Sequence, residues 1–437
     1  MKKDTQICEN ISVSQDGILL FAGQSTQALA QQYGTPLYLM DEDRIRDRMR
    51  TYKRGMEKAF GEYGHVLYAS KAASFKRIYE IAAQEGIGID VVSAGEIATA
   101  ALAGFPLENA YFHSNNKTDA DIRYAMEKGV GYFVVDNAEE LLAIDAIAGQ
   151  RALKQKLLLR ITPGIDPHTY DAVNTGMVDS KFGSAIETGQ AEEITRLALG
   201  LPNIDLQGFH CHVGSQVFDS EVYLQTADIM LAFIADMGKK LGFTAQKLDL
   251  GGGYGVRYTA DDPIIDIEEN IICVGKRVRE LVAQYELPML HICMEPGRSI
   301  VADAGMTLYT MGTLKRIPGY KNYVSVDGGM TDNPRFILYG SSYTLLPATQ
   351  MHAPRNMVCS VVGRCCESGD VIQENVPMPD TLKRGDLIAC LTTGAYNYSM
   401  ASNYNRIPRP AVVMLQGGKS YVAVKRETPE DVTRLDV

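Results

Sequence analysis

The first two thirds of the sequence contain eight short apolar runs, and most of them are followed by a polar turn and a helix-like segment. Most are rich in β-branched or aromatic residues, and they lie at 65–69, 87–92, 110–113, 131–135, 156–161, 206–211, 247–250 and 290–294. Strands that alternate with helices form βαβ units and a parallel sheet. Eight such units predict an α/β fold with a closed (β/α)₈ barrel.

Helix-start signals agree with this division of the chain. Ser93 is followed three residues later by Glu96, and Asn137 stands in the same relation to Glu140. This spacing is typical of a capping box, in which two side chains satisfy backbone N–H groups at a helix start. The strands predicted at 87–92 and 131–135 are therefore each expected to lead directly into a helix.

The pattern changes after about residue 300, where short alternating runs such as YVSVDGG, MVCSVVG and KSYVAVKRE are separated by glycine and proline. Such runs predict an antiparallel β domain. Residues 7–21 resemble a hairpin with a turn at Asp16-Gly17, and we expect it to pair into that domain. The predicted domains are a barrel at 36–300 and a β domain formed by 1–35 and 301–437.

Composition points to a small-molecule partner. The 437 residues carry a net charge of −10 without a long run of like charges, which disfavours nucleic acid and anionic membranes as partners. Neither a signal peptide nor a stretch of about 20 apolar residues is recognisable, so we expect a cytoplasmic protein. Its eight cysteines show no zinc-site spacing, which predicts reduced thiols and no structural metal.

Polar residues follow every predicted strand, and in a barrel of this type the carboxyl ends of the strands share one face. Lys71 follows the first run, Asp90 lies near the end of the second, and the seventh is followed by the glycines 251–253. Alone, such a lysine is usually a solvated charge and such glycines a tight turn. After strand seven, however, bare backbone N–H groups commonly bind phosphate, and Arg298 could pair with the same anion.

A lysine and a phosphate site on one barrel face indicate a phosphorylated aldehyde held as a Schiff base, which is pyridoxal 5′-phosphate (PLP). Glu295 could pair with the ring nitrogen and keep it protonated, and His212 could lie against the ring face. Each of these residues alone is more often structural. Their occurrence at successive strand ends favours the cofactor site.

The motifs YASKAAS, DVVSAGE, HSNNKT, VDSKFGS, HCHVGSQ, LDLGGGYG, MEPGR, CCESGD and GAYNYSMASNYN occur in this order between about residues 35 and 408. Together they resemble the diaminopimelate decarboxylases, which belong to the alanine-racemase-like (fold type III) PLP enzymes. The resemblance implies a PLP-binding barrel with a C-terminal β domain that includes the N-terminal strands.

The resemblance also implies roles for individual residues. Lys71 matches the Schiff-base lysine, His212 the ring-stacking histidine and Glu295 the partner of the ring nitrogen. The implied cofactor-binding set is Lys71, Asp90, His212, Ser215, Gly252, Gly253, Glu295, Pro296, Gly297, Arg298 and Tyr396. Family members are head-to-tail homodimers in which a Cys-Glu pair, here Cys366-Glu367, completes the partner's site.

The electronic effect of these residues on the cofactor ring predicts a decarboxylase. The substrate amine displaces Lys71, CO₂ departs, and the electrons flow into a ring that Glu295 keeps protonated. A racemase of this fold is expected to carry arginine there, so Glu295 argues against racemisation. The resemblance assigns reprotonation to Cys366, with Lys71 as the alternative donor. The implied catalytic residues are thus Lys71, Cys366, His212 and Glu295, without a metal.

The substrate depends on the far end of the pocket. The resemblance gives Arg298, Arg335, Tyr339 and Tyr396 as contacts of a distal carboxylate and Glu367 as the partner of a distal ammonium. This charge pair fits meso-2,6-diaminopimelate, whose decarboxylation to L-lysine is the last step of lysine biosynthesis. The chain departs from the family at 335–339, where Arg-Phe-Ile-Leu-Tyr replaces the usual Arg-Pro-Ala-Leu-Tyr.

Two alternatives differ from this interpretation. One is a decarboxylase of another basic amino acid, such as ornithine, arginine or lysine, or of carboxynorspermidine, on the same fold. The other is a non-enzymatic homologue that binds a partner protein, which predicts a damaged cofactor site. The residues Lys71, His212, Glu295, Arg298, Cys366 and Tyr396 are all intact, which disfavours the second alternative.

Overall fold

The structure is a computed structural model that describes residues 7–165 and 180–437. The chain divides into two compact units. The barrel unit comprises residues 48–255 and 264–299, and the β unit comprises residues up to 47, 256–263 and 300–437. The segment 36–47 and the insertion 256–263 therefore belong to the β unit by their contacts. The boundaries of the barrel domain near residues 36 and 300 stay a prediction.

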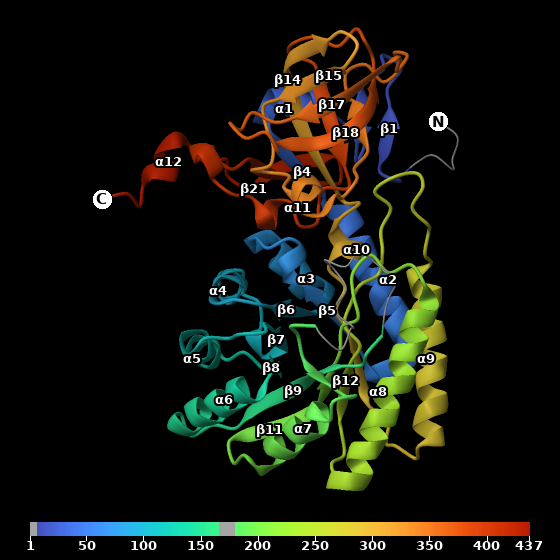
Figure 1. Ribbon diagram of the computed structural model, residues 1–437, viewed down its shortest axis with the longest axis vertical. Helices are drawn as coiled ribbons and strands as arrows, with labels where there is room; N and C mark the ends of the chain where they lie inside the picture. The colour runs from blue at the N-terminus through green and yellow to red at the C-terminus, as the bar shows by residue number, and fades with distance from the viewer. Residues whose placement is uncertain (1–6, 166–179) are drawn as a thin grey trace. The chain divides into compact units, whose positions relative to one another are not determined.

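The barrel unit contains the eight predicted strands in one closed parallel sheet (Figure 1). They are β5 (Gly64–Ala69), β6 (Gly88–Val91), β7 (Ala110–Phe112), β8 (Tyr132–Val135), β9 (Gln155–Thr162), β11 (Ile204–His210), β12 (Lys247–Asp249) and β13 (His291–Met294). The sheet closes because β13 pairs with β5 and β8 pairs with β9, all in parallel. The barrel prediction is confirmed, with one short extra strand, β10 (Ser184–Ala185), beside β9.

Helices surround this sheet. They are α2 (Glu42–Phe60), α3 (Lys76–Glu85), α4 (Ala94–Leu102), α5 (Asp119–Lys128), α6 (Ala138–Gln150), α7 (Gln190–Gly200), α8 (Ser220–Leu241) and α9 (Ile267–Gln284), and the short α10 (Arg298–Val301) follows β13. Ser93 and Asn137 accept hydrogen bonds from the backbone N–H groups of Glu96 and Glu140, which confirms the N-cap half of each predicted capping box. The reciprocal half differs, because the Glu96 carboxylate accepts from the Val92 N–H and that of Glu140 from Lys117 Nζ. Both caps start a helix within three residues of a strand, which fixes the turns at the strand ends.

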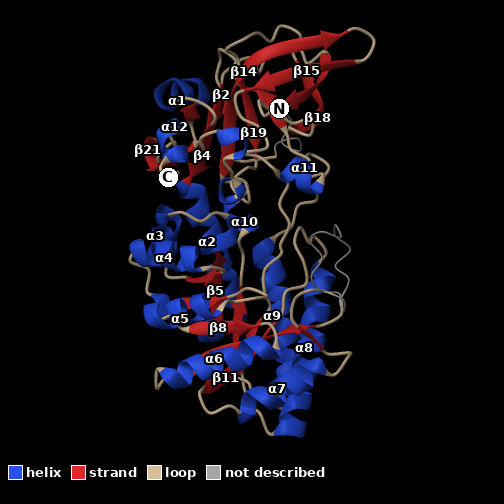
Figure 2. Cartoon of the chain, turned by 60° about the vertical axis from the view of Figure 1, so that its left-hand side comes forward, coloured by secondary structure: helices blue, strands red, loops and turns tan. Residues whose placement is uncertain are grey.

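The β unit is built mainly from antiparallel strand pairs, and Figure 2 shows its strands in red. Its strands are β1 (Ile11–Val13), β2 (Leu19–Phe21), β3 (Gln24–Ser25), β4 (Leu37–Asp41), β14 (Gly305–Ile317), β15 (Lys321–Val326), β16 (Leu345–Pro347), β17 (Met357–Val362), β18 (Val371–Met378), β19 (Leu387–Leu391), β20 (Ala411–Gln416) and β21 (Lys419–Val424). Its helices are α1 (Thr26–Tyr33), α11 (Arg335–Tyr339) and α12 (Pro429–Thr433). Two pairings, β15 with β17 and β4 with β20, are parallel.

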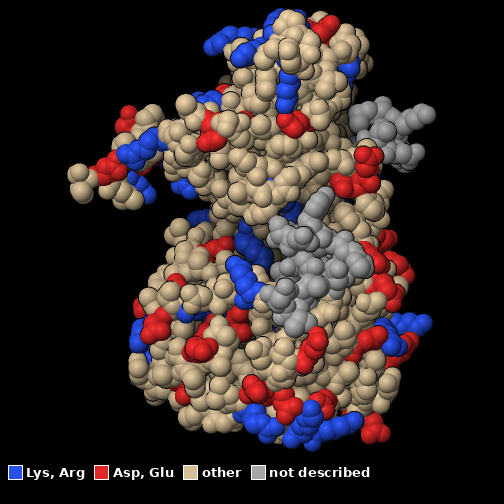
Figure 3. All heavy atoms as spheres, viewed as in Figure 1, with Lys and Arg blue, Asp and Glu red and all other residues tan. Residues whose placement is uncertain are grey.

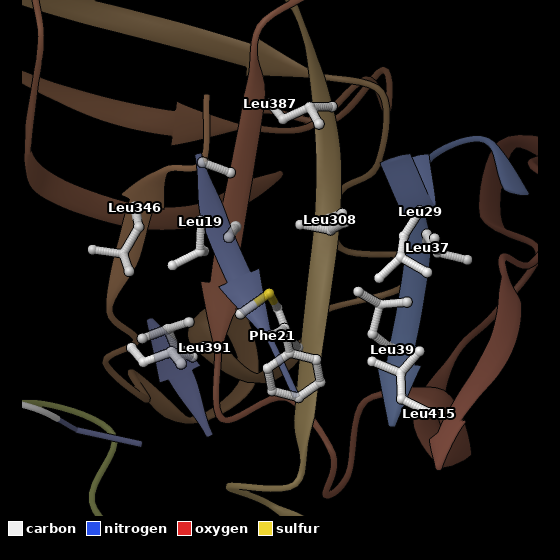
Figure 4. Packing of buried hydrophobic residues seen from close by; sticks show 14 of the residues in the cluster. Leu19, Phe21, Leu29, Leu37, Leu39, Leu308, Leu346, Leu387, Leu391 and Leu415 are labelled. Atoms are coloured by element: carbon white, nitrogen blue, oxygen red, sulfur yellow. The ribbon is translucent and has the colours of Figure 1, made fainter. Parts of the chain in front are cut away.

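The predicted N-terminal hairpin is present and packs into the β unit. β1 and β2 pair in antiparallel fashion around a turn in which the Gly17 N–H donates to Ser14 O over 3.0 Å. Leu19 and Phe21 are buried with Leu308 and Leu387 in one apolar core (Figure 4). Burial of this apolar surface holds the N-terminal strands to the C-terminal domain, as expected.

Acidic and basic side chains are interspersed on the face of each unit shown in Figure 3. Among the described residues, none of the helices has both the length and the apolar composition that a membrane crossing requires.

At the amino ends of the barrel strands, two histidines make the barrel sensitive to acid. His65 Nε2 lies 2.8 Å from His291 Nδ1, so one ring nitrogen must act as acceptor. Burial, with the nearby charges of Lys247 and His291, lowers the pKa of His65 to about 4. An unfolded histidine titrates near pH ~6.5, so the unfolded chain binds more protons between these values and stability falls as the pH is lowered through them.

We therefore expect the His65→Gln variant to lose less stability than the wild type between pH 7.5 and 5. The difference should be about 1 kcal/mol after allowance for the partly exposed ring. Thermal unfolding of both proteins across this pH range measures it, with His352→Gln as the control because His352 is exposed on the β unit. Parallel pH profiles for His65→Gln and wild type would contradict this assignment.

Candidate active site

Lys71 lies directly beyond the carboxyl end of β5, in the short 3₁₀ turn Ser70–Ala72. Its side chain is exposed, whereas Ser70 and Ala72 on either side are buried. Ser70 Oγ donates to Glu96 Oε2 over 3.0 Å, which holds the turn against the start of α4. A Cβ added at Gly297 would lie 2.9 Å from the Ala69 carbonyl oxygen, so glycine there lets the loop after β13 approach β5 closely. The turn thus presents one amine on the carboxyl face of the barrel.

Glu295 follows the last barrel strand and is held between two histidines. His210 Nε2 forms a hydrogen bond with Glu295 Oε2 at 3.0 Å, and His113 Nε2 lies 2.7 Å from Glu295 Oε1. All three side chains are buried. Burial alone would raise the pKa of Glu295, but His113 and His210 lower it well below its usual range. Glu295 is therefore a buried carboxylate that stays ionised at neutral pH.

His212 and Asp90 share the electrostatic environment of Lys71. Burial, followed by the charge of Lys71, lowers the pKa of His212 well below its usual value, so this imidazole is neutral. The Gly252 N–H donates to His212 Nδ1 over 3.3 Å and fixes the ring orientation. Burial raises the pKa of Asp90 to about 6, an effect that the neighbouring His113 opposes. Among the described residues, neither carboxylate oxygen of Asp90 has a hydrogen-bond partner.

The glycines after β12 form a turn that tolerates no side chain. Gly251 and Gly253 have φ values of +71° and +111°, a region that favours glycine. A Cβ at Gly252 would clash with the Glu295 carbonyl oxygen, and one at Gly253 with that of Gly214. Nearby in the barrel unit, Arg298 Nη2 donates to Ser215 Oγ over 2.8 Å. Arg298 is itself buried.

The remaining predicted residues lie in the β unit. Arg335 starts α11 and is only 5% exposed; its guanidinium carbon lies 5.4 Å from the Tyr339 ring centre and 5.5 Å from that of Tyr396. Tyr396 has a φ of +60°, an unusual conformation for a bulky residue and one that often marks a functional position. Cys366 and Glu367 are exposed on the loop between β17 and β18, where the Cys366 N–H donates to Asn405 Oδ1 over 2.8 Å.

The barrel residues fit PLP. Lys71 supplies an accessible amine, the glycine turn a backbone surface that no side chain covers, and Arg298 a buried cation beside a hydroxyl, which together suit an aldehyde and a phosphate. Glu295 is an ionised acceptor of the kind that a protonated ring nitrogen needs. His113, His210 and Glu295 also have ligand atoms within 4.8 Å of one another, a spacing that a metal ion could use. The expectation of no metal stays a prediction.

Comparisons with known proteins identify the family of this chain. Residues 42–302 match the family model described as "Pyridoxal-dependent decarboxylase, pyridoxal binding domain". The diaminopimelate decarboxylase of Bacillus subtilis (strain 168) is 42% identical over 424 residues, which is 97% of this chain and 96% of the relative. The chain belongs to the diaminopimelate decarboxylases. It is therefore a PLP-dependent decarboxylase, with the fold that the sequence predicts.

Solved structures add detail to this family membership. The diaminopimelate decarboxylase of M. jannaschii in complex with L-lysine matches with a TM-score of 0.89 and 30% identity over 98% of each chain. The lysine/ornithine decarboxylase of Vibrio vulnificus in complex with putrescine matches with a TM-score of 0.74 and 27% identity, over 89% of this chain and 97% of that one. The likeness to the diaminopimelate decarboxylase is the greater of the two.

The structure brings the predicted barrel residues together at the carboxyl ends of the strands. Of the predicted substrate residues, Arg335, Tyr339 and Tyr396 lie together in the β unit, whereas Arg298 belongs to the barrel unit. Of the motif VDSKFGS, residues 178 and 179 lie outside the described residues. Three buried residues that were not predicted as site residues lie close to Glu295, namely His113, His210 and Asp249. A histidine at a buried strand end is usually a packing residue, but three neighbouring polar strand ends could have signalled them.

Proposed function

We propose that this chain decarboxylates meso-2,6-diaminopimelate to L-lysine and CO₂, with the residues of the barrel holding PLP. When bound, PLP supplies a carbonyl that captures the substrate amine and a ring that withdraws electrons from the α-carbon. The observation that carries the proposal is the buried, ionised Glu295 in the same barrel face as Lys71. The diaminopimelate decarboxylases of Bacillus subtilis and M. jannaschii named above support the same substrate.

Each barrel residue has a defined task in this proposal. Lys71 supplies the amine that attaches the cofactor, and the neutral ring of His212 packs against the cofactor face. The glycine turn, whose backbone no side chain covers, binds the phosphate together with Ser215 and Arg298. Asp90 offers two oxygens without partners among the described residues to groups that enter the site.

Cys366 is proposed to return a proton to the α-carbon after CO₂ has left, and Lys71 is the alternative donor. Both Cys366 and Glu367 are exposed in the single chain, and the loop is fixed by the hydrogen bond from Cys366 to Asn405. Exposure of both side chains supports a homodimer in which this loop completes the partner subunit's site. Glu367 would then bind the distal ammonium of the substrate.

Arg335 is proposed to bind the distal carboxylate. It is buried, and its Nη2 donates to Ser341 Oγ over 3.2 Å. Among the described residues its Nε has no hydrogen-bond partner. A buried guanidinium with remaining donors favours a substrate that brings a carboxylate, because a substrate without one leaves the charge uncompensated.

The Arg335→Gln variant tests this pocket. We expect the KM for meso-diaminopimelate to rise about 10- to 100-fold, the cost of losing a hydrogen bond to a charged group. The absorption of bound PLP should not change. Arg384→Gln is a matched control, because Arg384 is an exposed arginine of the same unit. An unchanged KM in the Arg335 variant would remove this residue from the substrate site.

The substrate itself is tested by comparing CO₂ release from meso-diaminopimelate with that from ornithine, arginine, lysine and carboxynorspermidine, with PLP added. We expect the highest kcat/KM for meso-diaminopimelate. A higher value for one of the other four would support the alternative that the sequence left open.

We also propose a cytoplasmic location and a barrel domain bounded near residues 36 and 300. The eight cysteines are all free thiols, which suits a reducing compartment.

A further inference from the structure

Two buried histidines, His113 and His210, flank Glu295. The role inferred for them here rests on the proposed cofactor site. His113 is the first residue after β7, His210 is the last residue of β11, and Glu295 follows β13. Three strand ends that are far apart in the sequence thus deliver two imidazoles and one carboxylate to a single buried point. Each histidine contacts a different carboxylate oxygen: His113 Nε2 lies 2.7 Å from Oε1, and His210 Nε2 lies 3.0 Å from Oε2.

The contact chemistry defines which group donates. Burial lowers the pKa of His210, although Glu295 opposes this effect, so the ring is neutral and carries one N–H. Its Nδ1 has no partner among the described residues, which leaves Nε2 as the donor to Glu295 Oε2. His113 Nε2 and Glu295 Oε1 lie 2.7 Å apart in a close contact that lacks hydrogen-bond geometry, and neither atom has a hydrogen-bond partner among the described residues. The Nε2 atoms of His113 and His210 therefore contact the Glu295 carboxylate and no other described group.

A third neighbour, Asp249, does not compete for the negative charge. It is fully buried, and burial together with the charge of Glu295 raises its pKa well above the usual range. Its Oδ1 accepts the Gly251 N–H over 2.8 Å. The charge of the cluster is therefore concentrated on Glu295, the one carboxylate that two histidines contact.

A carboxylate has about four acceptor positions, so two histidine contacts leave room for a further donor. Without such contacts, burial would favour the neutral acid, which could not hold a ring nitrogen in its protonated form. We infer that His113 and His210 are positioning residues that fix the Glu295 carboxylate, one oxygen each, in the orientation and charge state that bind the protonated ring nitrogen of PLP. They act through Glu295 and not on the substrate.

If the two histidines act in this way, the affinity of the protein for its cofactor depends on the ring nitrogen. The probe is 1-deaza-PLP, in which a carbon replaces that nitrogen. The wild-type apoprotein is expected to bind PLP more tightly than the analogue. His210→Phe should reduce this preference, the ratio of the two dissociation constants, about 10-fold or more. Effects of this size are seen for groups that orient a ligand-binding residue. The His210→Gln variant, which retains an N–H donor, should restore most of the preference.

The dissociation constants of the two cofactors are measured by fluorescence titration of the apoproteins, and His113→Phe with His113→Gln provides a second pair should His210→Phe not fold. Equal losses of affinity for PLP and for the analogue would show a merely structural role and overturn the inference. An unchanged preference in a folded Phe variant would also overturn it. Since these titrations need no substrate, they can fail or succeed independently of CO₂ release by the wild type, which tests the proposed function.

Discussion

Replacing Lys71 with alanine is expected to abolish the visible absorption of covalently bound PLP and to lower kcat by at least ~10³-fold. The size follows from the loss of the only covalent link that the proposed site makes to the cofactor, because removal of a covalent catalyst typically costs several orders of magnitude. Absorption spectra and initial rates of CO₂ release measure both effects.

Lys76→Ala is the matched control, because Lys76 lies five residues further on, is 53% exposed and pairs with Glu80 on the surface of α3. It should retain both the absorption band and the activity. A Lys71→Ala variant that keeps the band would place the Schiff base on a different lysine and would contradict the proposed site.

The Cys366→Ala variant is expected to lower kcat by about 10²- to 10⁴-fold, the usual contribution of a positioned proton donor. The cofactor spectrum should remain that of the wild type, because Cys366 lies outside the proposed cofactor-binding set. Steady-state kinetics and the spectrum together separate loss of chemistry from loss of cofactor.

Cys273 provides the control for Cys366. Both thiols are exposed, but Cys273 lies on the outer helix α9. Cys273→Ala should therefore leave kcat unchanged. If Cys366→Ala were equally silent, the proton would have to come from another group, and Lys71 would be the first candidate.

The barrel could be predicted from sequence because its information is local. Each strand is a short apolar run, and capping residues such as Ser93 and Asn137 mark where the next helix begins. The β unit was harder to predict. β4 is a buried run of five residues, and nothing in that run indicates that it pairs with β14 on one side and β20 on the other. Pairing between segments so distant depends on the assembled core.

The site shows the same division. Lys71, His212 and Glu295 could be predicted because they follow strands at positions where barrels place their chemistry. The contacts of His113 and His210 with Glu295 could not, because they depend on the three-dimensional convergence of three strand ends. Burial, which determines the pKa of all these groups, is also a property of the folded barrel alone.

The most direct measurement of the central claim is the product balance of the purified protein supplied with PLP and meso-2,6-diaminopimelate. We expect CO₂ and L-lysine to form in equal amounts, and both products to be lost in Lys71→Ala. A wild-type protein that shows the absorption of bound PLP and yet releases neither product would contradict this claim.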